Sequence, residues 1–175
     1  MHDGHEFHAH HRRLDITRFK DTGMKQVDRY AYDLTVVDPQ GELRPAGTTS
    51  VETSFGWGAT VMAPGDGVVI DAENESVDRL PGAPPFDEEA VGTDCRQYLD
   101  TFVVIDHRNG GSGEGSPRPV PHLHYQLQDG PDPFRSEGLP STFTGFHRLR
   151  GSRRIAVARG QIDTGDIVEG SGPVR

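Results

Sequence analysis

The most informative stretch of this sequence is His122-Leu123-His124-Tyr125-Gln126-Leu127-Gln128, in which polar and apolar residues alternate. Alternate side chains of a β-strand lie on the same face of a sheet. We therefore expect His122, His124 and Gln126 on one face and the apolar residues between them in a core. Two imidazoles about 7 Å apart on one face serve as two ligands of a metal ion, or as one ligand beside an acid/base group. A solvated polar face is the alternative interpretation.

Short strands are predicted on both sides of this stretch. β-branched and aromatic residues, separated by turn residues, favour strands at residues 30–37, 59–63, 67–71, 101–106 and 155–158. Residues 59–63 and 67–71 are expected to form a hairpin around Pro64-Gly65-Asp66-Gly67. No helical period is sustained, although residues 87–99 are compatible with a helix. The chain is therefore expected to be all-β, as a sheet or a barrel.

Composition excludes several classes of protein. The 175 residues suffice for one domain, and no apolar run is long enough for a membrane span. Asp and Glu number 27 against 18 basic residues, and this acidic balance argues against a nucleic-acid partner. The single cysteine, Cys95, cannot form an internal disulfide. The first 13 residues lack the apolar stretch of a secretory signal, so we expect a cytoplasmic location. The oligomeric state is not indicated.

A second candidate functional residue is Asp33. It lies within the predicted strand at residues 30–37, which is otherwise largely apolar. A carboxylate buried there without a partner would cost free energy. Asp33 therefore either faces solvent at a sheet edge or binds a metal ion, whose charge would keep it ionised.

Four segments taken in order give this chain a resemblance to a known family. They are Tyr30-Ala31-Tyr32-Asp33-Leu34, the stretch from Val61 to Val69 with its Ala-Pro-x-x-Gly-x-Val pattern, Val103 to Gly110, and Pro121-His122-Leu123-His124-Tyr125-Gln126. In this combination they resemble the M23 family of zinc metallopeptidases, the lysostaphin- and LytM-like peptidoglycan endopeptidases. The resemblance covers residues 29–129. It implies a twisted antiparallel sheet, barrel-sandwich-like with long loops, that holds one Zn²⁺ in a groove.

The resemblance also implies an activity and a set of site residues. The chain would be a hydrolase that cleaves peptide bonds of cell-wall-type peptides, or peptidoglycan, by metal-activated water. Asp33 and His124 would bind the zinc ion, and His122 would act as an acid/base group or stabilise the oxyanion.

The sequence departs from the family pattern in two places. The first family ligand lies four residues before the Asp, where this chain has Arg29, and a guanidinium does not bind zinc. We expect His10 to replace it, with His11 and His8 as further candidates, against the alternative of a histidine-rich arm that binds metals adventitiously. A further catalytic histidine of the family has no counterpart in residues 109–121. A catalytically inactive M23-like binding module is therefore the alternative function.

The expected organisation has three parts. Residues 1–28 form a histidine-rich arm, residues 29–129 an M23-like domain with an acidic insertion at 72–98, and residues 130–175 a Pro/Gly-rich extension. A cupin-like metal barrel is a further alternative, because cupins also use a His-x-His strand. Their motif continues with a Glu where this chain has Gln126 and Gln128. A lipoyl or biotinyl carrier is excluded because Lys20 and Lys25 both precede the relevant strand.

Overall fold

Strands dominate the described part of this protein, as its β-branched and aromatic segments predict. A computed structural model describes residues 4–13, 18–19, 22–23, 25–76, 96, 99, 101–108 and 121–170. Its elements are α1 (His10–Arg13), β1 (Arg18–Phe19), β2 (Thr22–Gly23), the 3₁₀ helix η1 (Val27–Tyr30), β3 (Tyr32–Leu34), the 3₁₀ helix η2 (Val51–Thr53), β4 (Val68–Glu73), β5 (Phe102–Asp106), β6 (Leu123–Tyr125), β7 (Leu127–Gln128), β8 (Gly138–Leu139), β9 (Phe143–Arg150), β10 (Arg153–Gly160) and β11 (Ile167–Gly170). The all-β prediction is confirmed, since α1 is the one α-helix in these ranges.

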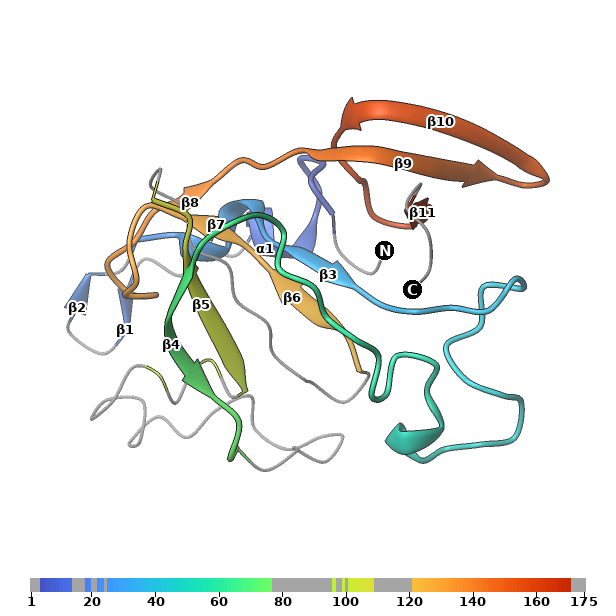
Figure 1. Ribbon diagram of the computed structural model, residues 1–175, viewed down its shortest axis with the longest axis horizontal. Helices are drawn as coiled ribbons and strands as arrows, with labels where there is room; N and C mark the ends of the chain where they lie inside the picture. Colours follow the sequence, from blue (N-terminus) through green and yellow to red (C-terminus); the bar gives the residue numbers. More distant parts are fainter. Residues whose placement is uncertain are drawn as a thin grey trace.

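The strands pair antiparallel in several small sheets rather than in one large sheet (Figure 1). A three-stranded sheet has the order β10-β9-β11, and the remaining strands form the pairs β1-β2, β3-β6, β4-β5 and β7-β8. In the part of the chain that the structure describes, these pairings do not close a barrel.

Several predicted strands are confirmed. Residues 101–106 contain β5, and residues 155–158 lie within the longer β10. The His122–Gln128 stretch forms β6 and β7, with Gln126 between them. Strand β3 is shorter than predicted, because η1 takes up Tyr30. The helix considered at residues 87–99 lies almost entirely outside the described residues, as does most of the acidic insertion.

The predicted hairpin at residues 59–71 is wrong. Residues 59–63 are not a strand, and β4 pairs with β5 instead, from Val68↔Asp106 to Glu73↔Phe102. Gly67, which was interpreted as a turn residue, is required for another reason. A Cβ on Gly67 would lie 2.5 Å from Cγ2 of Ile105. Gly67 therefore permits the chain to approach β5 closely, and a local turn pattern does not reveal this long-range contact.

Two apolar clusters lie beneath the strands. Tyr32 of β3, Phe146 of β9 and Ile162 form one buried cluster, which Tyr125 of β6 and Phe143 pack against. The other joins Phe102 and Val104 of β5 to Leu99. The first cluster fixes the β3-β6 pair against the three-stranded sheet, and thereby positions one face of that pair.

The N-terminal segment is tied to the C-terminal part of the chain. The backbone N–H of Gly4 donates to Oγ1 of Thr164 at 3.1 Å, and that of His5 donates to the carbonyl of Ile162 at 3.0 Å. Arg12 of α1 lies over the ring of Tyr30, with its Cζ 5.2 Å from the ring centroid. These contacts hold α1 beside the β3-β6 pair.

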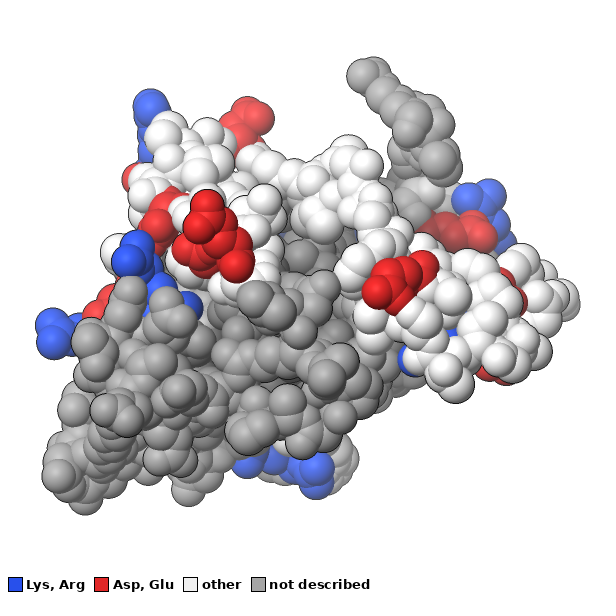
Figure 2. Space-filling model, turned by 90° about the horizontal axis from the view of Figure 1, so that it is seen from below, with Lys and Arg blue, Asp and Glu red and all other residues white. Residues whose placement is uncertain are grey.

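The surface carries charges of both signs. On the face in Figure 2, the described Lys and Arg side chains lie in small groups near the edges, and Asp and Glu gather in separate small clusters. Among the described residues, no helix has the length and apolar character that crossing a bilayer requires.

Substitution of Gly4 by Ala should release the N-terminal segment. A Cβ there would lie 2.4 Å from the backbone N of Thr164 and 2.7 Å from the carbonyl O of Ile162. We expect urea denaturation to show a loss of about 1–3 kcal/mol in Gly4→Ala. Gly170→Ala is the matched control, because a Cβ at Gly170 meets nothing within 4 Å. Equal unfolding midpoints for the two variants would contradict the tight packing of residue 4.

Candidate metal centre

The pairing of β3 with β6 places Asp33 directly opposite His124. Directly opposed residues of an antiparallel pair have neighbouring side chains on the same face. Nδ1 of His124 lies 3.0 Å from Oδ1 of Asp33, and the two side chains are 14 % and 11 % exposed. The other face of β3 carries Tyr32 into the apolar core. The alternation of the two strands therefore separates a polar site from the core.

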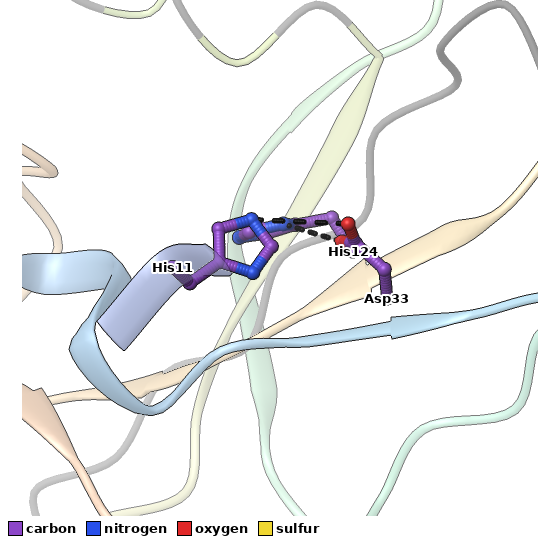
Figure 3. Close-up of side chains that lie close together, drawn as sticks. All are labelled: His11, Asp33 and His124. Atoms are coloured by element: carbon purple, nitrogen blue, oxygen red, sulfur yellow. Dashed lines mark hydrogen bonds and ion pairs between the residues drawn. The ribbon is translucent and has the colours of Figure 1, made fainter. Parts of the chain in front are cut away.

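His11 completes a three-residue group with this pair. It projects from α1 toward the carboxylate, with Nε2 3.8 Å from Oδ2 of Asp33 (Figure 3). Its ring meets the ring of His124 edge-on, with centroids 4.8 Å apart. One ligand atom from each of His11, Asp33 and His124 lies within 4.8 Å of the other two. Asp33 and His124 are 91 positions apart in the chain. The fold brings them together with His11 of the N-terminal segment.

A third imidazole faces the same carboxylate. Nε2 of His122 lies 3.6 Å from Oδ1 of Asp33, and the His122 side chain is 10 % exposed. His122 and His124 therefore point to the same face, as the alternation in the sequence predicts. The one carboxylate is surrounded by imidazoles from α1, from β6 and from the residue that precedes β6.

The group formed by His11, Asp33 and His124 has the donor types of a metal site, and its three ligand atoms lie within 4.8 Å of one another. Two imidazoles and one carboxylate are a usual ligand set of catalytic zinc, which keeps its fourth position open. Tetrahedral bonds of about 2.0–2.1 Å put neighbouring ligand atoms about 3.4 Å apart. The His124–Asp33 and His11–Asp33 distances of 3.0 and 3.8 Å lie on either side of that value.

His10, the first choice from the sequence, is not a member of this group. Residue 10 is exposed, and its ring lies edge-on to that of His11 with centroids 5.7 Å apart. Successive residues of a helix point about 100° apart, so His10 and His11 cannot both face Asp33. His11, the second candidate from the sequence, takes this place. The sequence of a four-residue helix does not show which of its side chains point toward the rest of the protein. His8 is also exposed.

Burial and charge act in opposite directions on the central pair. Burial by itself raises the pKa of Asp33, but the hydrogen bond from His124 and the charges of the three histidines outweigh it and lower the pKa to about 2. Burial likewise lowers the pKa of His124, but the hydrogen bond to Asp33 and the carboxylates of Asp28 and Asp33 raise the pKa to about 9. The site favours a cation beside the Asp33 carboxylate.

Three polar residues around His124 were not identified as functional from the sequence. Nε2 of His124 lies 3.0 Å from Oε1 of Gln126 and 3.8 Å from Oδ1 of Asp28. Gln126 in turn contacts Gln128, and the two glutamines are 1 % and 0 % exposed. The alternation of residues 122–128 places both glutamines on the histidine face. Gln128 pairs with Gly138 of β8, and the complete burial of the two glutamines is not visible in the sequence.

Comparison with models of known protein families, with curated proteins and with solved structures finds no match for this chain.

Replacement of His11 and of its neighbour His10 should have unequal effects. His11→Ala removes one of the three candidate ligands. We expect its zinc affinity to fall by more than the roughly 10–100-fold that loss of a supporting hydrogen bond costs. His10→Ala, the matched control on the same helix, should bind zinc as the unaltered chain does. Competition titration with a chromophoric chelator measures both affinities. A larger loss in His10→Ala than in His11→Ala would contradict the assignment.

After removal of metal with EDTA, the His124–Asp33 pair should make stability depend on pH. His124 has a pKa raised from 6.5 to about 9, so its contribution is complete below pH 6.5 and is lost as pH rises through about 9. Asp33 has a pKa lowered from 3.8 to about 2, so its contribution is complete above pH 3.8 and is lost as pH falls through about 2.

We therefore expect the Tm to fall by roughly 5–10 °C between pH 6.5 and 9 in calorimetric scans. His124→Gln should lack this alkaline decline. A Tm that stays constant over that interval in the unaltered chain would show that His124 is not held protonated by Asp33.

Proposed function

We propose that this chain is a zinc-dependent metalloendopeptidase of the M23 type that hydrolyses peptide bonds in cell-wall-type peptides. The observation that carries the proposal is the convergence of His11, Asp33 and His124, with His122 at the same carboxylate. This set has three zinc donors and one further histidine. It is the combination that a metal-activated water and a separate acid/base group require.

Each residue of the site has a defined task in this proposal. His11, Asp33 and His124 would hold the zinc ion. When bound, zinc supplies a Lewis acid for the scissile carbonyl and lowers the pKa of the attacking water. Asp33 offers two oxygens, of which Oδ2 faces His11 and Oδ1 faces His124 and His122. Asp33 therefore orients His124 by a hydrogen bond and places negative charge beside the rings of His11 and His122.

His122 is the proposed acid/base residue. It lies next to the carboxylate but outside the group of atoms that could share one ion. Its Nε2 is 3.6 Å from Oδ1 of Asp33, so the imidazolium that forms when His122 takes a proton would be stabilised by that charge. His122 would then return the proton to the amine that leaves. A contribution of about 10²–10⁴ in rate is typical of such a group.

The finer fold assignment belongs to the same proposal. We propose that β3 and β6, with their neighbouring strands, correspond to the twisted antiparallel sheet of an M23 core. The antiparallel pairing of Asp33 with His124 supports this, since it brings the two motif residues of the resemblance together on one face.

The alternative is an M23-like module that binds peptides without cleaving them. One observation favours it. The family has a further catalytic histidine, and His107, the nearest candidate in sequence to replace it, is engaged at a turn, where its Nδ1 lies 2.8 Å from the carbonyl O of Asp66. Residues 109–120, where the family histidine would fall, lie outside the described residues.

Incubation of the zinc-loaded chain with oligoglycine peptides and with purified peptidoglycan tests the proposal. We expect new amino termini, detected by mass spectrometry, that disappear with EDTA and return with zinc. His122→Ala should lower the rate by about 10²–10⁴ and still bind one zinc per chain.

The outcomes separate the two functions. A zinc-loaded chain that binds these peptides and leaves them intact would establish the binding module and refute the peptidase. His147→Ala is a suitable control, because His147 lies on β9, outside the proposed centre. Equal loss of cleavage in His122→Ala and His147→Ala would contradict the role given to His122.

A further inference from the structure

Two buried glutamines connect the metal centre to the backbone of a turn. Nε2 of Gln126 donates to Oε1 of Gln128 at 2.5 Å, and Nε2 of Gln128 donates to the carbonyl O of Gly130 at 2.6 Å. Gln126 and Gln128 are 1 % and 0 % exposed. Side-chain amides are rarely buried so completely unless their hydrogen bonds are made. We call Gln126, Gln128 and the Gly130 carbonyl the glutamine relay.

The direction of the relay is fixed at Gly130. A backbone carbonyl only accepts hydrogen bonds, so the amide nitrogen of Gln128 must face it. Oε1 of Gln128 therefore faces Gln126 and requires a donor there. Oε1 of Gln126 is left at the other end, 3.0 Å from Nε2 of His124. The relay thus presents an acceptor to His124.

This acceptor favours a proton on Nε2 of His124, which leaves Nδ1 as the nitrogen that a metal ion beside Asp33 would meet. Nε2 meets Oε1 of Gln126 at 3.0 Å and has the carboxylate of Asp28 at 3.8 Å, and both favour a proton on Nε2. Nδ1 donates to Asp33 when no metal is bound, and with Nε2 protonated it is the nitrogen whose proton a metal ion would replace. Nδ1 is also the atom that faces Asp33 at 3.0 Å. A ligand histidine held by a hydrogen bond at its other nitrogen is oriented and made more basic.

We propose that the glutamine relay is a positioning device that holds His124 in the Nε2–H tautomer, with Nδ1 turned to the metal. This inference rests on the metal centre of the proposed function, but not on peptidase activity. The relay residues touch neither substrate nor metal and act through His124.

Strand β8 and the 3₁₀ helix η1 pack together next to the glutamine relay. Gln128 lies opposite Gly138 in the β7-β8 pair, and the N–H of Gly138 donates to the carbonyl of Gln26 at 3.3 Å. A Cβ on Gly138 would lie 2.2 Å from the carbonyl O of Val27, so β8 rests directly on η1. The same 3₁₀ helix carries Asp28. One packed unit therefore holds both groups that face Nε2 of His124.

The test compares Gln126→Leu with the double variant Gln126→Leu/Gln128→Leu. The single variant removes the acceptor of His124 and leaves Oε1 of Gln128 buried without its donor, so both the Tm and the zinc affinity should fall. The double variant removes both buried amides. We expect it to recover most of the lost Tm while its zinc affinity stays about 10–100-fold below that of the unaltered chain. Gln40→Leu, at an exposed position, is the control for the substitution itself.

A spectroscopic measurement reports the protonation of His124 directly. Long-range ¹H–¹⁵N spectra of the zinc-loaded chain, labelled at histidine, show which nitrogen of His124 is protonated and which is coordinated. We expect a proton on Nε2 and coordination through Nδ1 in the unaltered chain, and a mixture of the two arrangements in the double variant.

The results separate the relay from the centre. A double variant that binds zinc as tightly as the unaltered chain and keeps the proton on Nε2 would overturn the relay and leave the metal centre standing. Coordination of zinc through Nε2 in the unaltered chain would also overturn it. Failure of the unaltered chain to bind zinc would overturn both. Failure to cleave peptides would bear on the proposed function alone.

Discussion

The contact of the Asp33 carboxylate with three imidazoles is the constraint on which the rest of the site depends. Asp33 is nearly buried, and a carboxylate in that position needs compensating charge or hydrogen bonds. His124 supplies a hydrogen bond from the opposite strand, and His11 and His122 add their rings from two other segments. Because the compensation comes from three separate places, the site exists only when α1, β3 and the His-x-His strand are all correctly packed.

That dependence explains several features that look unrelated along the chain. The core residue Tyr32 and the site residue Asp33 are neighbours on β3, so one short strand both anchors the sheet and carries the carboxylate at the centre of the candidate site. Gly4 and His5 are hydrogen-bonded to residues 162–164, near β11, and this attachment helps to hold the N-terminal segment at the site. The C-terminal residues 162–164 therefore support the site from a distance.

Much of the site was predictable because it follows from strand periodicity. The alternation of residues 122–128 correctly placed His122, His124 and Gln126 on one face. Asp33 was identified because a carboxylate within an apolar strand requires an explanation. The hairpin at residues 59–71 was predicted wrongly, since its turn-like glycine serves a close approach to β5. The structure brings His11 rather than His10 to Asp33, and a four-residue helix shows no period from which its inward side could be read.

The sequence by itself determined that this chain is built of strands and that two histidines and an aspartate lie on polar faces of those strands. These properties depend on residues one or two positions apart, and local backbone geometry fixes them. Tertiary structure alone decided that His11 completes the group, that β4 pairs with β5, and that Gln126 and Gln128 are buried beside His124. Each of these contacts joins segments or surfaces that no short stretch of sequence specifies, and each is selected by the packing of the whole chain around the β3-β6 pair.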